Sequence, residues 1–400
     1  MILKRTLTML FLTLPLLCQA QVPAQVPAQQ PAQQPAQTPA QEARRPWSLR
    51  IVDALTRPSE KLDTSYLFQR KPQWNASLTS GLMQSRVRQE NSFFLDGEGD
   101  EMVPATLNTE LLERPFRQIG LQAGYGSMTL GYSLEIGRRS AEKRSAFLLD
   151  LMMAGQAVQI QYYNITQPMT YVLGIGNPGT SNYVEYASGS DFPGRQKVFM
   201  LDGFYALNRK RFAFNAAYTG YKVQRRTAGS FMLSLKYLQG EVLVDPNEGY
   251  TAYIGNLTRY GTNQVSLGAG YSLNLVAFHR QPSDGYGKGL RNLTFNLTLM
   301  PMVTPLNRLV TVMARYDEES DTYVEGSRNA IWGDVRLNYT TRGAVAWSFG
   351  RCCASITASY DTFTFQSSKS QDKNFAQVHS LETKAVFDKW QVNFRVNFHF

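Results

Sequence analysis

The chain has 400 residues, of which 18% are charged, and a formal net charge of +10 at pH 7. The positive charges are scattered, and the short basic cluster Arg209, Lys210 and Arg211 is typical of a solvated turn, so no nucleic-acid partner is expected. After the first twenty residues the cysteines are Cys352 and Cys353, which are adjacent and lack the spacing of a disulfide framework or a Cys/His metal site. Neither a metal nor another cofactor is expected.

The first twenty residues have the layout of a secretory signal peptide. Lys4 and Arg5 precede an apolar run from Leu7 to Leu17, and the small residue Ala20 marks the expected cleavage site. This run is far shorter than the ~20 residues that a membrane-spanning helix needs. The exported chain is therefore either a soluble protein or a closed barrel, since only helices and closed barrels satisfy the backbone in lipid.

Residues 21–42 contain a Pro-Ala-Gln repeat with proline at every fourth position. Such a segment lacks apolar bulk and favours extended conformations, which predicts a disordered linker. Residues 43–73 are mixed in composition, and we expect either a short periplasmic segment or a plug. The barrel itself is predicted to cover residues 74–400.

From residue 74 onward, apolar and polar side chains alternate with a period of two. In one segment Leu267, Leu273 and Leu275 share a face, and Asn274 lies on the other. Strands of about ten residues with Asn, Gln, Ser, Thr and Gly on the polar face are typical of transmembrane barrels, whereas strands of a soluble sandwich average about 5–6 residues. We therefore predict an all-β, antiparallel transmembrane β-barrel in the outer membrane of a Gram-negative bacterium. An arginine should be tolerated at Asn274 but not at Leu273.

The alternation predicts about fourteen strands. Twelve is the alternative, because the alternation is weak over 241–250 and the segment 103–125 is long enough to contain a bend. Short turns are expected on the periplasmic side, among them 208–211, and long outer connections at 168–196, 305–329 and 367–389. The predicted strands cover 74–88, 103–125, 127–137, 145–153, 157–167, 197–207, 211–221, 229–238, 241–250, 264–279, 290–304, 330–348, 351–366 and 390–400.

The last strand ends on the final residue, with aromatic side chains on its apolar row. Phe394, Phe398 and Phe400 resemble the C-terminal assembly signal of outer-membrane barrels. The expected partners are therefore outer-membrane lipid, lipopolysaccharide and the barrel-assembly machinery.

Several short motifs resemble those of the Bacteroidota outer-membrane barrels catalogued as domain of unknown function 4421. The resemblance covers roughly residues 60 to 400, departs at Ala213 and Asn215, where serine and proline are expected, and implies a barrel without naming a reaction or ligand. The motifs are Asp63-Thr-Ser-Tyr66, Tyr205-Ala-Leu-Asn208, Arg211-Phe212, Ala216-Ala-Tyr218, Gln224-Arg-Arg226, Ala228-Gly-Ser230 and Arg342-Gly343.

The polar rows contain charges of both signs in near balance, which predicts a polar lumen with weak ion preference. Among the charged residues on these rows are Lys236, Asp202 and Asp361. Asp334 and Arg336 are expected to form a structural ion pair, with a gate or ligand clamp as the alternative. The lumen-facing candidates are Asp334, Arg336, Arg342, Asn274, Asn296 and Arg395.

The three histidines fall in separate parts of the predicted barrel, and the chain has no Gly-x-Ser-x-Gly elbow, so an enzyme is not expected. The polar lumen favours a passive pore or small-solute channel for small polar solutes. Two alternatives stay open: a structural or assembly component of an envelope or secretion complex, and a transporter for apolar compounds with residues 43–73 as its plug.

Overall fold

The computed structural model describes residues 62–96, 102–112, 115–136, 145–153, 156–175, 184–247, 257–370 and 381–400. The signal segment with its cleavage site at Ala20, the linker 21–42 and residues 43–61 lie outside the described residues. Within the described ranges, no helix has both the length and the apolar character needed to cross a membrane.

Almost all described residues belong to antiparallel strands, and the helical part is one short 3-10 helix, η1. The elements are β1 (Leu67–Gln69), β2 (Trp74–Asp96), β3 (Met102–Leu112), β4 (Phe116–Tyr125), β5 (Met128–Ile136), β6 (Ser145–Met153), β7 (Gln156–Ile175), β8 (Val184–Ala206), η1 (Phe214–Ala217), β9 (Lys222–Gln224), β10 (Ala228–Val244), β11 (Leu257–Arg280), β12 (Arg291–Asp317), β13 (Thr322–Trp332), β14 (Arg336–Phe349), β15 (Cys352–Ser370) and β16 (Leu381–His399).

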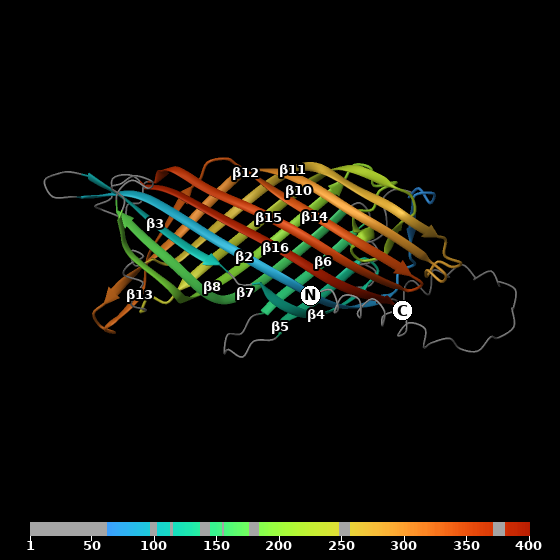
Figure 1. Ribbon diagram of the computed structural model, residues 1–400, viewed down its shortest axis with the longest axis horizontal. Coiled ribbons are helices and arrows are strands. Elements are labelled where there is room, and N and C mark those ends of the chain that lie inside the picture. Colours follow the sequence, from blue (N-terminus) through green and yellow to red (C-terminus); the bar gives the residue numbers. More distant parts are fainter. Residues whose placement is uncertain are drawn as a thin grey trace, which may run out of the picture. The chain divides into compact units, whose positions relative to one another are not determined.

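Fourteen of these strands form one sheet, and its pairings return to their starting point. The last strand, β16, pairs with the first strand of the sheet, β2, from Glu382 opposite Ser92 to His399 opposite Asn75. The remaining gap in the order is closed by β11 and β12, which also pair with each other. Figure 1 shows the strands running obliquely to the long axis, as strands in a closed barrel must.

At two positions in this cycle of pairings, two strands lie end to end and pair with different parts of the same neighbouring strand. Residues 74–83 of β2 pair with β4, and residues 86–96 of β2 pair with β3. In the same way β12 pairs first with β14 and then with β13. A hairpin of β5 and β6 fits between β4 and β7, and beyond it β3 pairs directly with β7.

Several sequence predictions about individual strands are wrong. Residues 211–221 form no wall strand, because they contain η1, and the expected short turn 208–211 belongs to a longer segment, 207–227, between β8 and β10. The predicted strand 241–250 is not separate, because β10 continues to Val244. Much of the three long outer connections is strand as well, since β7, β8, β12, β13, β15 and β16 extend into them.

The two faces of the wall differ in the way the alternation predicts. On β11, Leu267, Tyr271 and Leu275 are exposed on the outer surface, whereas Ser272 and Asn274 are fully buried on the inner one. Because neighbouring strands pair in register, the same division continues onto β10 and β12.

Along the strands, the outer face changes from apolar to polar, and the inner face changes from polar to apolar. On the outer face of β10, exposed Phe231, Leu233 and Leu235 are followed by Tyr237, Gln239 and Glu241. On the inner face of the same strand the order is opposite, with Ser234 and Lys236 followed by Leu238 and Val242. We call the part of the wall with the exposed apolar side chains the apolar band, and the part beyond it the outer half.

The outer half carries charged side chains on its outer face, where some of them form ion pairs. Arg86 Nε lies 2.5 Å from Glu110 Oε1, and Arg259 Nη2 lies 2.6 Å from Glu325 Oε1. Its interior contains an apolar cluster, which we call the outer core, and also buried polar side chains such as Ser85, Gln89 and Gln196. The outer core consists of Met83, Val87, Leu107, Tyr163, Tyr171, Val198, Met200, Leu238, Val242, Val244, Tyr260, Phe363 and Phe387.

Candidate functional site in the barrel lumen

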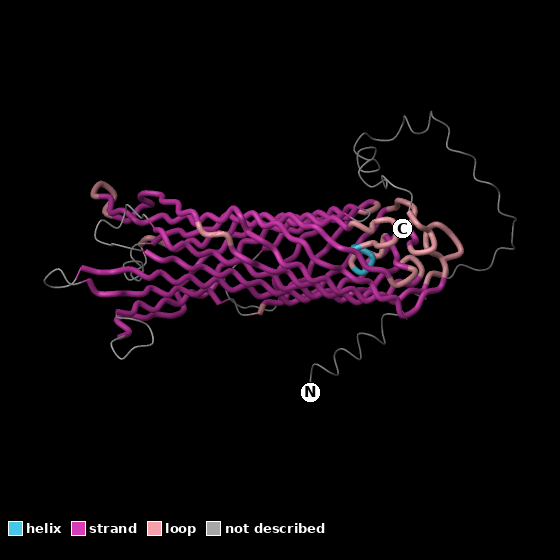
Figure 2. Tube along the Cα trace, turned by 90° about the horizontal axis from the view of Figure 1, so that it is seen from above, coloured by secondary structure: helices cyan, strands magenta, loops and turns pink. Residues whose placement is uncertain are grey.

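The end of the barrel next to the C-terminus is filled by a plug made of two segments of the chain, residues 62–73 and 207–227. The first contributes β1 and the second contributes η1 and β9, and β1 pairs with β9 in a separate two-stranded sheet. Figure 2 shows η1, in cyan, among the loops of the barrel end that holds the C-terminus. Residues 62–73 are the described part of the segment for which the sequence left a periplasmic segment or a plug open.

Gln224 joins the two segments of the plug. Its side-chain Nε2 donates to the carbonyl oxygens of Arg211 at 2.7 Å, Arg226 at 3.0 Å and Tyr66 at 3.3 Å. Its Oε1 accepts the backbone N–H of Ala213 at 3.1 Å. A single buried amide thus satisfies the backbone of a segment without regular structure, which would otherwise be costly to bury.

Ala213 stands at the start of η1, at a position where the family resemblance predicts serine. It has no side chain to cap the helix. Gln224 accepts the N–H of Ala213 itself at 3.1 Å, and Asn274 of β11 donates to the Ala213 carbonyl oxygen at 2.8 Å. The backbone of Ala213 is thus bonded on both sides although the residue offers no side-chain cap.

Polar side chains of the wall hold the plug in place. Asn274 Nδ2 also donates to Gln224 Oε1 at 3.2 Å, and Asn292 Nδ2 donates to the Gln224 carbonyl oxygen at 2.8 Å. The Tyr218 hydroxyl donates to Asn296 Oδ1 at 3.0 Å. The polar row of β11 and β12 is thus a set of plug contacts, and the asparagines on it are fully or almost fully buried.

An outer layer of charged contacts covers the plug. Arg211 Nε lies 3.1 Å from Asp63 Oδ2, and the guanidinium of Arg211 lies over the Tyr66 ring at 5.2 Å. The Ser65 hydroxyl and backbone N–H donate to Asp63, and together with Arg211 they lower the pKa of this carboxyl group. Most of the motif residues of the family resemblance therefore meet at the plug.

Apolar side chains complete the packing of the plug against the wall. Phe214 stacks on Phe204 of β8 with ring centroids 5.1 Å apart. Gly220 has a φ of +68°, and a Cβ added to it would lie 2.5 Å from the Cβ of Cys353, so this close approach requires glycine. The plug thus seals the barrel end through both hydrogen bonds and shape.

Some buried polar groups of the plug lack a hydrogen-bond partner among the described residues, among them the side-chain amide of Asn215 and the ammonium group of Lys222 on β9. Lys222 is 1% exposed. Burial lowers the pKa of its ammonium group to about 7.

A layer of buried charges lies directly beyond the plug. Lys236 Nζ contacts Asp361 Oδ1 at 2.5 Å and Asp202 Oδ1 at 3.3 Å, and Arg342 Nη2 contacts Asp202 Oδ2 at 2.8 Å. Arg342 also donates to Gln159 Oε1 at 2.5 Å. The side chains of the two acids and of Lys236 are at most 4% exposed. Removing one member would leave an uncompensated buried charge, which typically costs about 3–5 kcal/mol.

A small cavity lies between this charge layer and the plug. Its volume is about 50 Å³, and Tyr218 of the plug forms part of its lining together with Gln159, Arg342, Ser359, Asp361 and Arg395. Arg395 Nη1 lies 3.4 Å from the Tyr218 carbonyl oxygen. Lys389 lies beside the cavity and donates to Gln161 Oε1 at 2.5 Å.

Three layers therefore follow one another along the lumen: the plug, the charge layer and the outer core. On β8 the order is Phe204, then Asp202, then Met200 and Val198. Each of these four side chains is at most 4% exposed. A water-filled pore would leave lumen-facing side chains accessible, whereas the residues of the charge layer and the outer core are at most 7% exposed.

The structure brings together four of the six lumen-facing candidates and leaves out two. Asn274, Asn296, Arg342 and Arg395 surround the plug tip and the cavity. Asn274 is fully buried and bonded to the plug, which argues against the expectation that arginine would be tolerated there. Asp334 and Arg336 lie at the junction of β13 and β14, where their side chains are 51% and 31% exposed and 3.5 Å apart.

Gln159, Tyr218 and Lys389 also belong to this site, although the sequence pattern does not point to them. Tyr218 falls in the expected wall strand 211–221, and Lys389 falls in the expected outer connection 367–389. The inner face of β16 carries Thr383, Ala385, Phe387 and Lys389. Because these side chains are partly polar and partly apolar, they form no recognisable amphipathic pattern.

The aromatic residues of the C-terminal strand lie on the outer wall or at its end. Phe398 and Phe400 are 43% and 66% exposed, and the Phe400 N–H donates to the Trp74 carbonyl oxygen at 2.9 Å. Phe394 is half-buried and pairs with Ser80 of β2. All three lie at or near the seam between β16 and β2.

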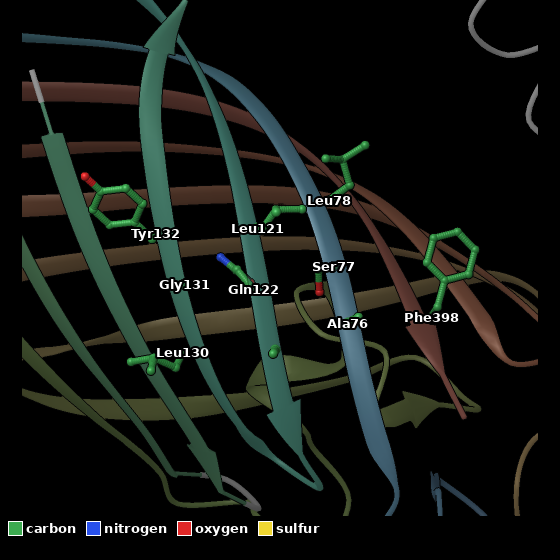
Figure 3. Close-up of a pocket in the computed structure, with 10 residues that line it drawn as sticks. Ala76, Ser77, Leu78, Leu121, Gln122, Leu130, Gly131, Tyr132 and Phe398 are labelled. Atoms are coloured by element: carbon green, nitrogen blue, oxygen red, sulfur yellow. The ribbon is translucent and has the colours of Figure 1, made fainter.

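The outer wall has a shallow apolar groove at this seam, with a volume of about 650 Å³. Figure 3 shows it between Leu121, Leu130 and Tyr132 on one side and Leu78 and Phe398 on the other. Small side chains such as Ala76 form its floor. No charged residue lines this groove.

Some solved structures are similar to this chain at low identity, each with a TM-score below 0.5. The outer membrane protease OmpT from Escherichia coli is 10% identical, with a TM-score of 0.39, over 82% of this chain and 97% of that chain. A Pseudomonas aeruginosa FadL homologue is 9% identical, with a TM-score of 0.19, over 82% and 90%. The translocator domain of the autotransporter NalP from Neisseria meningitidis is 11% identical, with a TM-score of 0.15, over 90% and 95%.

No curated protein matches this chain. A family model does match, over residues 62–387, and this range includes both segments of the plug, the charge layer and nearly the whole wall. The chain therefore belongs to the family described as domain of unknown function DUF4421.

Proposed function

We propose that this chain is a closed β-barrel of an outer membrane with a structural or assembly role in the envelope. The observation that carries the proposal is the buried charge layer, whose side chains fill the lumen beyond the plug. The closed lumen favours this role over the passive pore, the first of the three functions that the sequence suggested.

The apolar band supports a location in a membrane. On the outer row of β16 it runs from Trp390 to Phe400, about 33 Å along the strand and about 25 Å along the barrel axis at a typical tilt. This height equals that of the apolar band of known transmembrane barrels, about 25 Å. Lipid and lipopolysaccharide are the proposed neighbours of the band.

Aromatic side chains at both borders of the band support the same location. Trp74 and Tyr125 pack edge to face at the plug end, with centroids 5.4 Å apart. At the opposite border Phe199 packs edge to face on Tyr237 at 6.1 Å. Two such girdles are characteristic of the interfaces of a transmembrane barrel. The outer half then stands in water, which explains its charged outer face and apolar interior.

Conductance in planar bilayers tests the closed barrel. The purified protein should insert without stable open steps, and a variant in which a short Gly-Ser linker replaces residues 209–226 should stay closed as well, because the charge layer and the outer core also fill the lumen. Stable open steps from the parent protein would overturn the proposal and favour the passive pore. Fractionation tests the location, because the protein should be found with outer membranes and not in a soluble periplasmic extract.

A plugged transporter for apolar compounds is the second candidate, and the outer core favours it. Its interior surface is apolar and contains Tyr163, Tyr260, Phe363 and Phe387. Cells that carry the protein should then take up an apolar dye faster than cells without it. Equal uptake rates would remove this candidate.

A further inference from the structure

We propose that the cavity between the plug and the charge layer binds a small anion of the size of chloride or a simple carboxylate. This inference requires the folded barrel and its plug, and it goes beyond the proposed role in the envelope. It assigns a ligand class to Arg395 and to the cavity-facing groups of β15 and β16.

The size of the cavity limits the ligand. A volume of about 50 Å³ holds about three or four water-sized spheres. The cavity is thus too small for a sugar or a nucleotide and large enough for a small ion with one water.

The groups that line the cavity determine the sign of the charge. Arg342 and Arg395 contribute two guanidinium groups, which can only donate hydrogen bonds. The one carboxylate in the lining, Asp361, already accepts from Lys236 Nζ at 2.5 Å and from Thr340 Oγ1 at 2.7 Å. Lys389 adds another ammonium group beside the cavity.

Neutral donors complete the proposed site. Gln391 and Asn393 of β16 and Thr357 and Ser359 of β15 line the same cavity. Amide and hydroxyl groups can turn their N–H or O–H toward an anion. In this enclosed, poorly hydrated space, hydrogen bonds from charged donors to an anion are stronger than in water.

Anion binding should stabilise the plug, because Tyr218 of the plug lines the cavity. An anion next to Arg395 would lie against the plug tip, where the Tyr218 hydroxyl already donates to Asn296. A ligand that binds only the seated plug stabilises that state by mass action. Anion binding should therefore hold the plug closed.

The test compares chloride with gluconate, which is too large for the cavity, at equal ionic strength on the full-length protein in detergent micelles. The midpoint of heat-modifiable gel migration and the hydrogen exchange of residues 207–227 are measured. In the parent, chloride should raise the midpoint saturably and slow the exchange. Arg395→Gln should lose this response, and Arg336→Gln, which removes an arginine outside the cavity, should keep it.

Equal behaviour of the parent in both salts would overturn the proposal, as would a full chloride response in Arg395→Gln. If Arg395→Gln does not fold, Ser359→Leu offers a second test because it fills the cavity and leaves every charge in place. A folded Ser359→Leu protein that responds to chloride like the parent would equally reject the site.

Discussion

Asn274 of β11 donates its side-chain N–H to Gln224 Oε1 of the plug at 3.2 Å, across a separation of 50 residues in the chain. The same Gln224 oxygen accepts the N–H of Ala213. This shared acceptor connects the wall to the plug, so the hydrogen bonds of the lumen are part of what closes the barrel.

Replacing Gln224 should loosen the plug without unfolding the wall. Gln224→Leu leaves the Ala213 N–H and the Arg211 and Arg226 carbonyl groups without their partner, which should cost about 1–3 kcal/mol. Limited trypsin digestion should then cut faster at the basic cluster 209–211. Gln239→Leu on the outer face of β10 serves as the control, and equal digestion of the two variants would contradict the role assigned to Gln224.

The apolar band predicts a difference between two positions on the same face of the same strand. Leu235 is 48% exposed within the band, and Gln239 is exposed four residues further along β10. Leu235→Arg should cost about 2–4 kcal/mol near the middle of a membrane, and Gln239→Arg about 0–1 kcal/mol. Folding titrations into lipid vesicles measure both. Equal costs would mean that the band does not face lipid.

The terminal aromatic residue should matter for assembly more than for the final fold. Phe400→Asp keeps the backbone bond to Trp74 but places a charge where an exposed aromatic side chain stood. Insertion in cells should fall several-fold, as judged by the amount of heat-modifiable protein in outer membranes. Phe400→Tyr should restore it. Normal insertion of Phe400→Asp would show that the assembly signal lies elsewhere.

The burial of Lys222 predicts that the protein is less stable at low pH than at high pH. Because burial lowers its pKa from the ordinary 10.5 to about 7, the folded protein binds fewer protons than the unfolded one between these pH values. The destabilisation is complete below pH 7 and fades as the pH rises toward 10.5. Lys222→Met should therefore raise the free energy of unfolding by about 1–3 kcal/mol at pH 6 and by much less at pH 10.

Thermal unfolding of the purified protein at the two pH values checks this prediction. Lys71→Met, which removes an exposed lysine from the same plug, serves as the control. A gain from Lys222→Met that is equal at both pH values would show that the ammonium group is not the source of the cost.

The sequence by itself determined the all-β class and the faces of the strands in the apolar band. On β11 and β12 the alternation is regular because one face meets an apolar surrounding and the other a polar interior, and a period of two records this difference directly. The family membership also followed from short motifs, since the residues of those motifs are neighbours in the chain.

Only the tertiary structure decided the plug, the charge layer and the outer half. Residues 211–221 alternate like a strand, but the backbone of Ala213 is bonded to the side chains of Gln224 and Asn274, which lie elsewhere in the chain, and no local pattern encodes such partners. In the outer half both faces change character where the wall leaves the band, so the apolar-out pattern ends although the strand continues. Lys236 and Asp202 face each other on the paired strands β10 and β8, whereas Asp361 lies on β15, and only the closed pairing of the wall brings it to them.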